Sequence, residues 1–404
     1  MDLKSAYKQV PSCFKQIGLT VVAVWSPKHQ RVMFFIAYCQ LFGGKSPPLN
    51  FARSPAWMCE VNAVLFGAPT SHCVDDIISV EPESLAAAGN MAFKSLCLLT
   101  GWAISEEKSP EPSYSFIVIG VQLDLSSVPE GEAAIRVTEK RIEQLDLILR
   151  KIRDDDRLGS GDAAQVTGKL GFTLCACFGR YGRAKLRPLI RRCGERHVKL
   201  NPQLLEAIEF WLRFLVTYKP RYIPVFYETR DITVSYSDGE GSKAGLGIAV
   251  WSTLQQKPFA AFCEIPEEIR ELWDKQRAKE EERRDIFLIE AIGPLSILRT
   301  FPNIMRNSIW LHFIDNEGAQ HSLVKGSSSI EAGDVVVGET WEWIQRLNVI
   351  PYFDRVESEA NPVDGLSRGR PEGPWTQVDR ALLPDGLIEK LRKCRVSEGP
   401  DACL

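Results

Sequence analysis

The sequence predicts a multidomain α+β protein. An α+β segment and a helical segment are followed by an α/β domain with a mixed five-stranded sheet. Three observations lead to this prediction: strands and helices alternate early, apolar residues recur at helical spacing in the middle, and the last third has the order β-β-β-α-β-α-β. A chain of 404 residues holds two or three domains with cores of their own. We expect segments 1–125, 126–229, 230–372 and a tail, 373–404.

The composition is that of a globular protein, with 45% hydrophobic and 25% charged residues. The net charge of -3 does not indicate a nucleic-acid binder, so such a function requires local clusters of basic residues. The eleven cysteines include no C-x-x-C pair and suit a reducing compartment. No signal peptide or membrane-spanning apolar run is present. We expect an intracellular protein, nuclear or cytoplasmic, that does not contact a membrane.

An acidic pair, Asp75 and Asp76, lies between two short apolar runs in the sequence SHCVDDIISV. This pattern predicts two short strands that meet at a tight turn with the acids at its tip. Adjacent carboxylates repel each other, so the pair is a poor choice for a simple turn and a good one where a divalent cation bridges them. A solvated acidic turn is the alternative interpretation.

The elements around this turn complete the first segment. Strand-like runs, LTVVAVWS and RVMFFIAYCQLF, precede a helix from about Leu49 to Leu65. A second amphipathic helix covers Glu83 to Leu99, and SFIVIGVQLDL reads as a pair of strands broken at Gly120.

Five motifs, DLKSAY, LFGGKSPPLNFAR, VDD, GWAISEEKS and FIVIGVQLD, occur in an order that resembles the palm of reverse transcriptases. The resemblance implies that Asp2 and Asp75 hold two Mg²⁺ ions, with Asp76 beside them, and that Mn²⁺ is the alternative ion. The metals would assist attack of a primer hydroxyl on a nucleotide phosphate. The resemblance also implies a set of nucleotide-binding residues: Tyr7, Phe42, Gly43 and Lys108.

Two departures from the reverse transcriptase pattern affect the polymerase prediction. Cys73 stands where the family has tyrosine, and only Met1 precedes Asp2, where the family has its fingers. We therefore expect an impaired polymerase. A fragment of a complete enzyme and a decayed element are both compatible with the sequence.

The middle of the chain predicts three helices, at the place of a thumb and connection: Glu132–Asp155, Asp162–Phe178 and Pro202–Val216. A basic cluster, Gly179–Lys199, lies between the last two and has Glu195 as its one acid. The cluster predicts binding to a phosphate backbone. A solvated helix face is the alternative. The candidate nucleic-acid-binding residues are Arg180, Arg183, Lys185, Arg187, Arg191 and Arg192.

The last domain places acids at the ends of its elements. Asp238 ends the first strand, Glu290 lies among apolar residues of the first core helix, Asp315 ends the fourth strand, and Asp364 follows the fifth. A buried carboxylate such as Glu290 requires a partner. The charged run from Glu267 to Asp285 carries no predicted chemistry, and four unrelated acids remain the alternative interpretation.

This arrangement resembles ribonuclease H. The resemblance implies that Asp238, Glu290, Asp315 and Asp364 hold two Mg²⁺ ions that support hydrolysis of RNA paired to DNA. The phrase NPVDGLSR resembles a retroelement motif, N-x-x-D-x-x-S-R, and with the palm motifs it indicates a DIRS-like retrotransposon. His312 and His321 are predicted to be structural or surface residues.

We therefore predict a reverse transcriptase with a C-terminal ribonuclease H domain. The nuclease half is the better candidate for activity, because all four of its acids are present. The expected partners of the chain are RNA–DNA hybrids and template RNA or DNA, with deoxynucleotides added if the polymerase half is intact. The alternative from another class is a non-catalytic nucleic-acid-binding relic. After residue 373 we expect a short helix, Gln377–Lys393, and a polar end.

Overall fold

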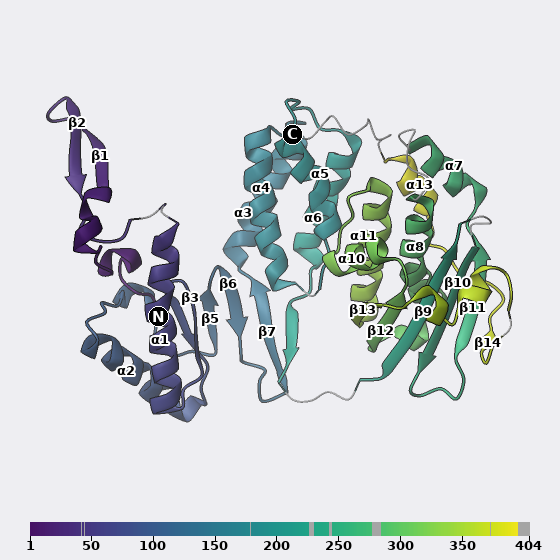
Figure 1. Ribbon diagram of the computed structural model, residues 1–404, viewed down its shortest axis with the longest axis horizontal. Coiled ribbons are helices and arrows are strands. Elements are labelled where there is room, and N and C mark those ends of the chain that lie inside the picture. The colour runs from purple at the N-terminus through teal and green to yellow at the C-terminus, as the bar shows by residue number, and fades with distance from the viewer. Residues whose placement is uncertain are drawn as a thin grey trace. The chain divides into compact units, whose positions relative to one another are not determined.

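The computed structural model describes residues 1–41, 43, 45–177, 179–225, 230–241, 245–276, 284–371 and 373–394. The chain forms two compact units, unit 1 (Met1–Ser126) and unit 2 (Ser127–Leu404) (Figure 1). Helices and strands are mixed along the chain, and the largest sheet contains parallel and antiparallel strands. The predicted mixed α and β character is confirmed at this level.

Unit 1 is built around two long helices, α1 (Ser46–Phe66) and α2 (Glu83–Leu99). The predicted hairpin at the acidic pair is present as β3 (Thr70–Cys73) and β4 (Asp76–Ser79). A short 3₁₀ helix, η1 (Ala6–Gln9), follows the first residues of the chain. The apolar core joins all these parts, and its buried members include Leu3, Phe51, Met58, Ile77 and Phe93.

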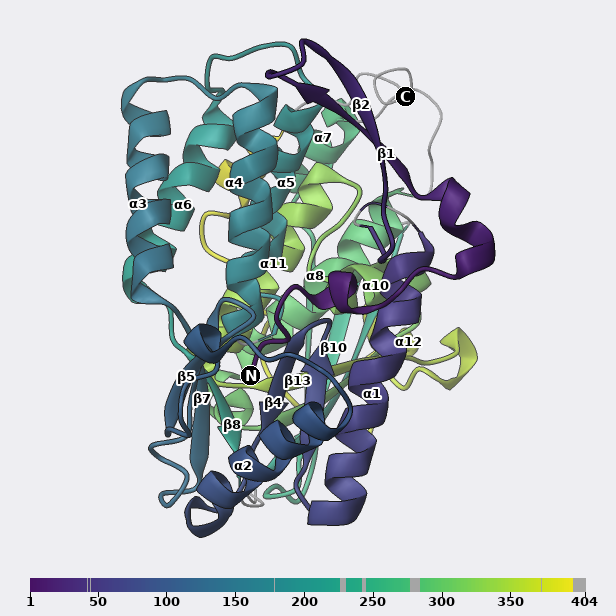
Figure 2. The same ribbon diagram turned by 90° about the vertical axis from the view of Figure 1, so that its left-hand side faces the viewer.

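Two further hairpins belong to unit 1. The first, β1 (Val21–Ser26) with β2 (Arg31–Ile36), follows η2 (Phe14–Leu19) and extends away from α2 (Figure 2). The second, β5 (Ser115–Val118) with β6 (Val121–Asp124), follows η3 (Glu106–Lys108). Its two turn residues, Ile119 and Gly120, both have positive φ, as a two-residue turn of type I′ requires.

Unit 2 opens with a strand and a helical bundle. The bundle consists of α3 (Glu139–Asp154), α4 (Ser160–Thr173), η4 (Leu174–Ala176), α5 (Arg183–Cys193) and α6 (Pro202–Thr217). Its core includes Leu149, Leu170, Leu189 and Trp211. The helix predicted from Glu132 is corrected, because residues 132–137 form strand β7, which pairs with β8 (Arg221–Pro224). Pairing with a distant strand overrides the local helical spacing here.

The rest of unit 2 surrounds a six-stranded sheet in the order β13-β12-β9-β10-β11-β14 (Figure 1). Its strands are β9 (Ile232–Glu240), β10 (Gly245–Ser252), β11 (Phe259–Glu264), β12 (Ile309–Ile314), β13 (Ile350–Arg355) and β14 (Thr376–Gln377). β9 is antiparallel to β10 and parallel to β12. The sequence predicts five of these strands; the two-residue β14 is the addition.

Helix α8 (Arg284–Thr300) packs on β9 and β10, and α11 (Glu331–Leu347) packs on α8. The main core lies between these helices and the sheet and includes Ile248, Ile292, Trp310 and Val337. The remaining helices are α7 (Glu267–Gln276), α9 (Pro302–Met305), α10 (Glu317–Lys325), η5 (Ser358–Ala360), α12 (Asp364–Ser367) and α13 (Leu387–Arg392).

The tail also differs from its prediction. The helix expected over Gln377–Lys393 is limited to α13, and residues 376–377 join the sheet. Leu387 and Leu391 are buried in the main core, so this part of the tail belongs to the fold of unit 2. Among the described residues, no helix is long and apolar enough to cross a membrane.

Candidate metal centre

Two acids meet at one edge of the large sheet because of how their strands run. Asp238 lies near the carboxyl end of β9, and Asp315 follows the last residue of β12. β9 and β12 are parallel neighbours, so their carboxyl ends lie together. The strand predicted to end at Asp238 continues to Glu240, which leaves this aspartate inside the sheet and only 5% exposed.

The third acid, Glu290, comes from α8 and is 1% exposed. The helix approaches the sheet closely at Gly293, where a Cβ atom would lie 2.4 Å from the Cβ of Ser237. One carboxylate oxygen of Glu290 accepts a hydrogen bond of 2.7 Å from the backbone N–H of Gly239. The other oxygen, Oε2, is buried and has no hydrogen-bond partner among the described residues.

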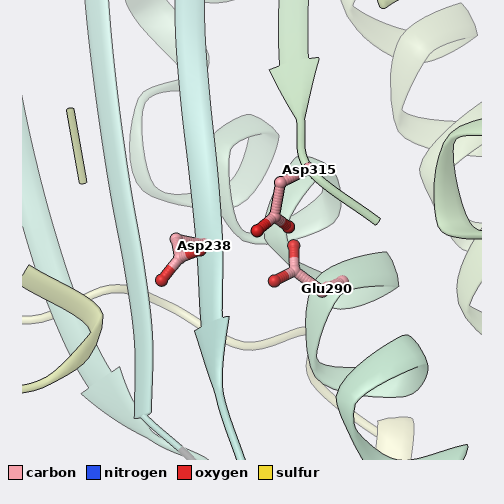
Figure 3. A group of neighbouring side chains, drawn as sticks. All are labelled: Asp238, Glu290 and Asp315. Atoms are coloured by element: carbon pink, nitrogen blue, oxygen red, sulfur yellow. The ribbon is translucent and has the colours of Figure 1, made fainter. Parts of the chain in front are cut away.

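The carboxylates of Asp238, Glu290 and Asp315 therefore form one group, with an oxygen of each within 4.8 Å of the others. Figure 3 shows the carboxylates of Glu290 and Asp315 facing each other across from Asp238. Burial, together with the charge of Asp315, raises the pKa of Asp238 to about 6. Burial and the neighbouring charges of Asp315 and Asp238 also raise the pKa of Glu290 well above its usual value.

This acidic triad has the properties of a cation site. Buried like charges repel each other and lose their hydration, and a bound divalent cation offsets both costs. Carboxylate oxygens are the ligands that hard cations such as Mg²⁺ prefer. Oε2 of Glu290, which has no hydrogen-bond partner among the described residues, has lone pairs that a cation would use. The triad therefore fits a divalent metal ion.

The fourth predicted carboxylate, Asp364, begins α12 and is not part of the triad. Its Oδ1 accepts hydrogen bonds from Nε and Nη2 of Arg368, at 3.2 and 2.8 Å. Its charge nevertheless contributes to the raised pKa of Asp238, after burial and Asp315. Asp364 thus borders the site from the next segment of chain.

In unit 1 the structure brings Asp2 beside Asp76, as an isolated antiparallel bridge. The pairing continues on both sides, since Leu3 N donates to the carbonyl of Asp75 and Ile77 N donates to that of Met1. Burial, then the charges of Asp75 and Asp2, raise the pKa of Asp76. Among the described residues, the triad of unit 2 brings one carboxylate oxygen from each of three acids within 4.8 Å of the others, and Asp2, Asp75 and Asp76 do not form such a group.

The predicted nucleotide-binding residues of unit 1 lie in different surroundings. Lys108 Nζ is 3.6 Å from a carboxylate oxygen of Asp2. Tyr7 is 9% exposed, and its ring packs on that of Phe51 at 4.9 Å between centroids. Gly43 has a φ of +91°, and Phe42 lies outside the described residues.

One member of the basic cluster 179–199 is buried. Arg192 is 1% exposed, and its guanidinium donates to the carbonyls of Leu158, His197 and Lys199. A buried guanidinium of this kind cannot contact a phosphate backbone, so its predicted role is corrected to a structural one. The alternation of basic residues in the sequence gives no sign of this burial.

Three more cations of the cluster pair with acids from other helices. Lys185 pairs with Glu206 of α6 at 2.8 Å. Arg191 pairs with Glu331 at 3.0 Å, and Arg187 lies 3.5 Å from Asp334, both acids belonging to α11. Arg180 and Arg183 are exposed, although Arg180 Nε donates to the carbonyl of Val324. The cluster is therefore largely an internal contact of unit 2.

Two buried polar residues near the triad had no predicted role. Asn361 and Ser367 are 5% and 1% exposed and lie in the NPVDGLSR segment. The spacing of the motif was the available signal, but within this segment the sequence predicted a role only for Asp364.

No protein-family model and no curated protein matches this chain.

Proposed function

We propose that unit 2 carries a ribonuclease H-like domain that hydrolyses the RNA strand of RNA–DNA hybrids, within a chain that derives from a retroelement reverse transcriptase. The acidic triad Asp238, Glu290 and Asp315 is the observation that carries this proposal. The motif order along the chain and the mixed sheet with parallel β9 and β12 support it.

Each of the four acids would be a metal ligand in the proposed site. The triad would hold one Mg²⁺ ion, and Asp238 with Asp364 would hold a second. Bound metal supplies an activated water and stabilises charge on the departing oxygen. The protein orients the ligands: Gly239 N–H fixes one oxygen of Glu290, and the hydroxyl of Ser358 donates to Asp315 at 2.5 Å.

The proposal predicts metal-dependent cleavage of a labelled RNA strand in an RNA–DNA hybrid. The wild-type chain should cleave with Mg²⁺ and not with EDTA. Asp315→Asn should lose cleavage, because it removes a carboxylate of the triad, while the exposed Asp379→Asn serves as the matched control. Cleavage that persists in Asp315→Asn would contradict the proposed site.

The same assay separates the enzyme from the non-catalytic relic. A folded chain that binds the hybrid and does not cleave it would favour the relic. The exposed cations Arg180 and Arg183 remain candidates for hybrid contact within the basic cluster.

A second proposed activity is DNA synthesis by unit 1, as a palm. The observation that favours it is the bridge between Asp2 and Asp76 with Lys108 near Asp2. We expect at most weak extension of a primer on an RNA template with deoxynucleotides and Mg²⁺. Any extension should be absent in Asp76→Asn.

A further inference from the structure

The turn and helix from Asn361 to Arg368 pack on the sheet next to the triad. Helix α12 contacts β9 and β10. The contact is close because Gly247, the cross-strand partner of Asp238, has no side chain: a Cβ atom there would lie 2.7 Å from Ser367 N. The backbone of α12 therefore rests against β10 at the level of Asp238.

Asn361 connects the two segments that carry acids. Its Nδ2 donates to the carbonyl of Ser237 at 3.0 Å and lies 3.5 Å from Oδ1 of Asp238. Its own Oδ1 accepts from the N–H of Val363 at 3.3 Å. One buried side chain thus ties the strand of Asp238 to the turn that begins α12 with Asp364.

Ser367 is the last residue of α12 and is also buried. Its hydroxyl donates to the carbonyl of Asp364 at 2.8 Å. Its backbone lies against Gly247, the cross-strand partner of Asp238, so the serine borders both segments that carry acids. Both residues direct their polar groups at the segments that carry the acids.

We propose that Asn361 and Ser367 are positioning residues of the metal centre, which hold Asp238 and the neighbouring α12 in the arrangement that binds a divalent cation. The inference rests on the function proposed above and extends it to residues that carry no charge. Side chains that orient metal ligands in this way typically change metal affinity by about 10–100-fold when they are replaced.

The test measures Mn²⁺ binding to the full chain by electron paramagnetic resonance of the free ion. Asn361→Leu removes the amide with little change in size, and Ser367→Ala removes one hydroxyl. Ser296→Ala is the matched control, because Ser296 is also fully buried and donates to the carbonyl of Leu382, far along the chain. Asp315→Asn defines binding without the triad.

We expect Mn²⁺ affinity to fall about 10–100-fold in Asn361→Leu and Ser367→Ala and to remain unchanged in Ser296→Ala. If Asn361→Leu does not fold, Ser367→Ala decides the question. Wild-type affinity in the Ser367 variant, or an equal loss in the Ser296 control, would overturn the positioning role alone. A wild-type chain that binds no more Mn²⁺ than Asp315→Asn would overturn the metal centre and this inference together.

Discussion

At the scale of single residues, the acidic triad opposes folding when no cation is bound. Burial raises the pKa of Asp238 and of Glu290, and the neighbouring charge of Asp315 raises both further. Such an arrangement is expensive in a protein core. It is therefore better explained by ligand binding than by stability.

A first prediction concerns Asp238→Asn. Burial raises the pKa of this carboxyl from its ordinary 3.8 to about 6 in the folded chain, so its stabilising effect is present at low pH and is lost as pH rises through 6. The amide has no such charge, and at pH 7 it should stabilise the metal-free chain by about 2–3 kcal/mol. Urea unfolding in EDTA at pH 5 and pH 7 measures this. A variant less stable than wild type at pH 7 would mean that the charged Asp238 carboxylate is stabilised by its surroundings, and would contradict the prediction.

A second prediction concerns His312, which is buried and has its pKa lowered by burial to about 3. Trp310 Nε1 can only donate, and it donates to Ser235 Oγ at 2.6 Å. We expect the Ser235 proton to go to His312 Nδ1, at 2.9 Å, and Nε2 to carry the ring proton toward Ser237. The low pKa keeps this buried ring neutral at pH 7.

Ring ¹⁵N chemical shifts should show the Nε2–H form of His312, unchanged between pH 8 and pH 5. The lowered pKa also means that this residue reduces stability as pH falls below 6.5, because the unfolded chain then takes up a proton that the folded chain does not. Titration of the His312 signal near pH 6 would contradict this assignment.

At the scale of elements, the arginines of α5 join it to α11. Arg187 faces Asp334, whose pKa is raised by burial to about 6 while Arg187 and Arg191 oppose the rise. The side chain of Asp334 is 10% exposed, so loss of its cation leaves a poorly hydrated charge. The pair therefore contributes to the packing of the helical bundle on the part of unit 2 that contains the six-stranded sheet.

A third prediction follows for Arg187→Met. It should destabilise unit 2 by about 1–3 kcal/mol at pH 7, because Asp334 loses its cation. Adding Asp334→Asn should restore part of that loss, as urea unfolding of the single and double variants would reveal. Equal losses in both would mean that Arg187 acts through packing and not through its charge.

At the scale of the whole molecule, the chain consists of two compact units, each with its own core. Only unit 2 contains a triad with metal-site geometry among the described residues. A cation that binds the folded state raises the unfolding temperature of the part that binds it.

A fourth prediction is therefore made for calorimetry. The chain should unfold in two transitions, and Mn²⁺ should raise the Tm of the transition that belongs to unit 2. Asp315→Asn should abolish this shift, whereas Asp76→Asn in unit 1 should leave it unchanged. A shift that survives Asp315→Asn would place the cation elsewhere in the chain.

Much of the local structure could be predicted from the sequence. Helix α2 has its predicted bounds, the hairpin at Asp75 and Asp76 is present, and the strands of the large sheet follow in the expected order. Apolar periodicity and turn residues act over a few positions, so they are legible in the sequence alone. The acids of the triad were also singled out there, Asp238 and Asp315 at strand ends and Glu290 among apolar residues of a helix, and the resemblance to ribonuclease H implied them as metal ligands.

Long-range contacts decided the rest. Residues 132–137 became a strand because β8 pairs with them, and β14 joined the sheet through β11. The guanidinium of Arg192 is buried and donates to the carbonyl of Leu158, 34 positions away in the sequence. The arginines of α5 pair with acids of α11. Charge in a sequence does not reveal its partners. The sequence by itself determined which carboxylates this protein has; the tertiary structure decided which three meet, because only packing of α8 on parallel β9 and β12 sets the distance between them.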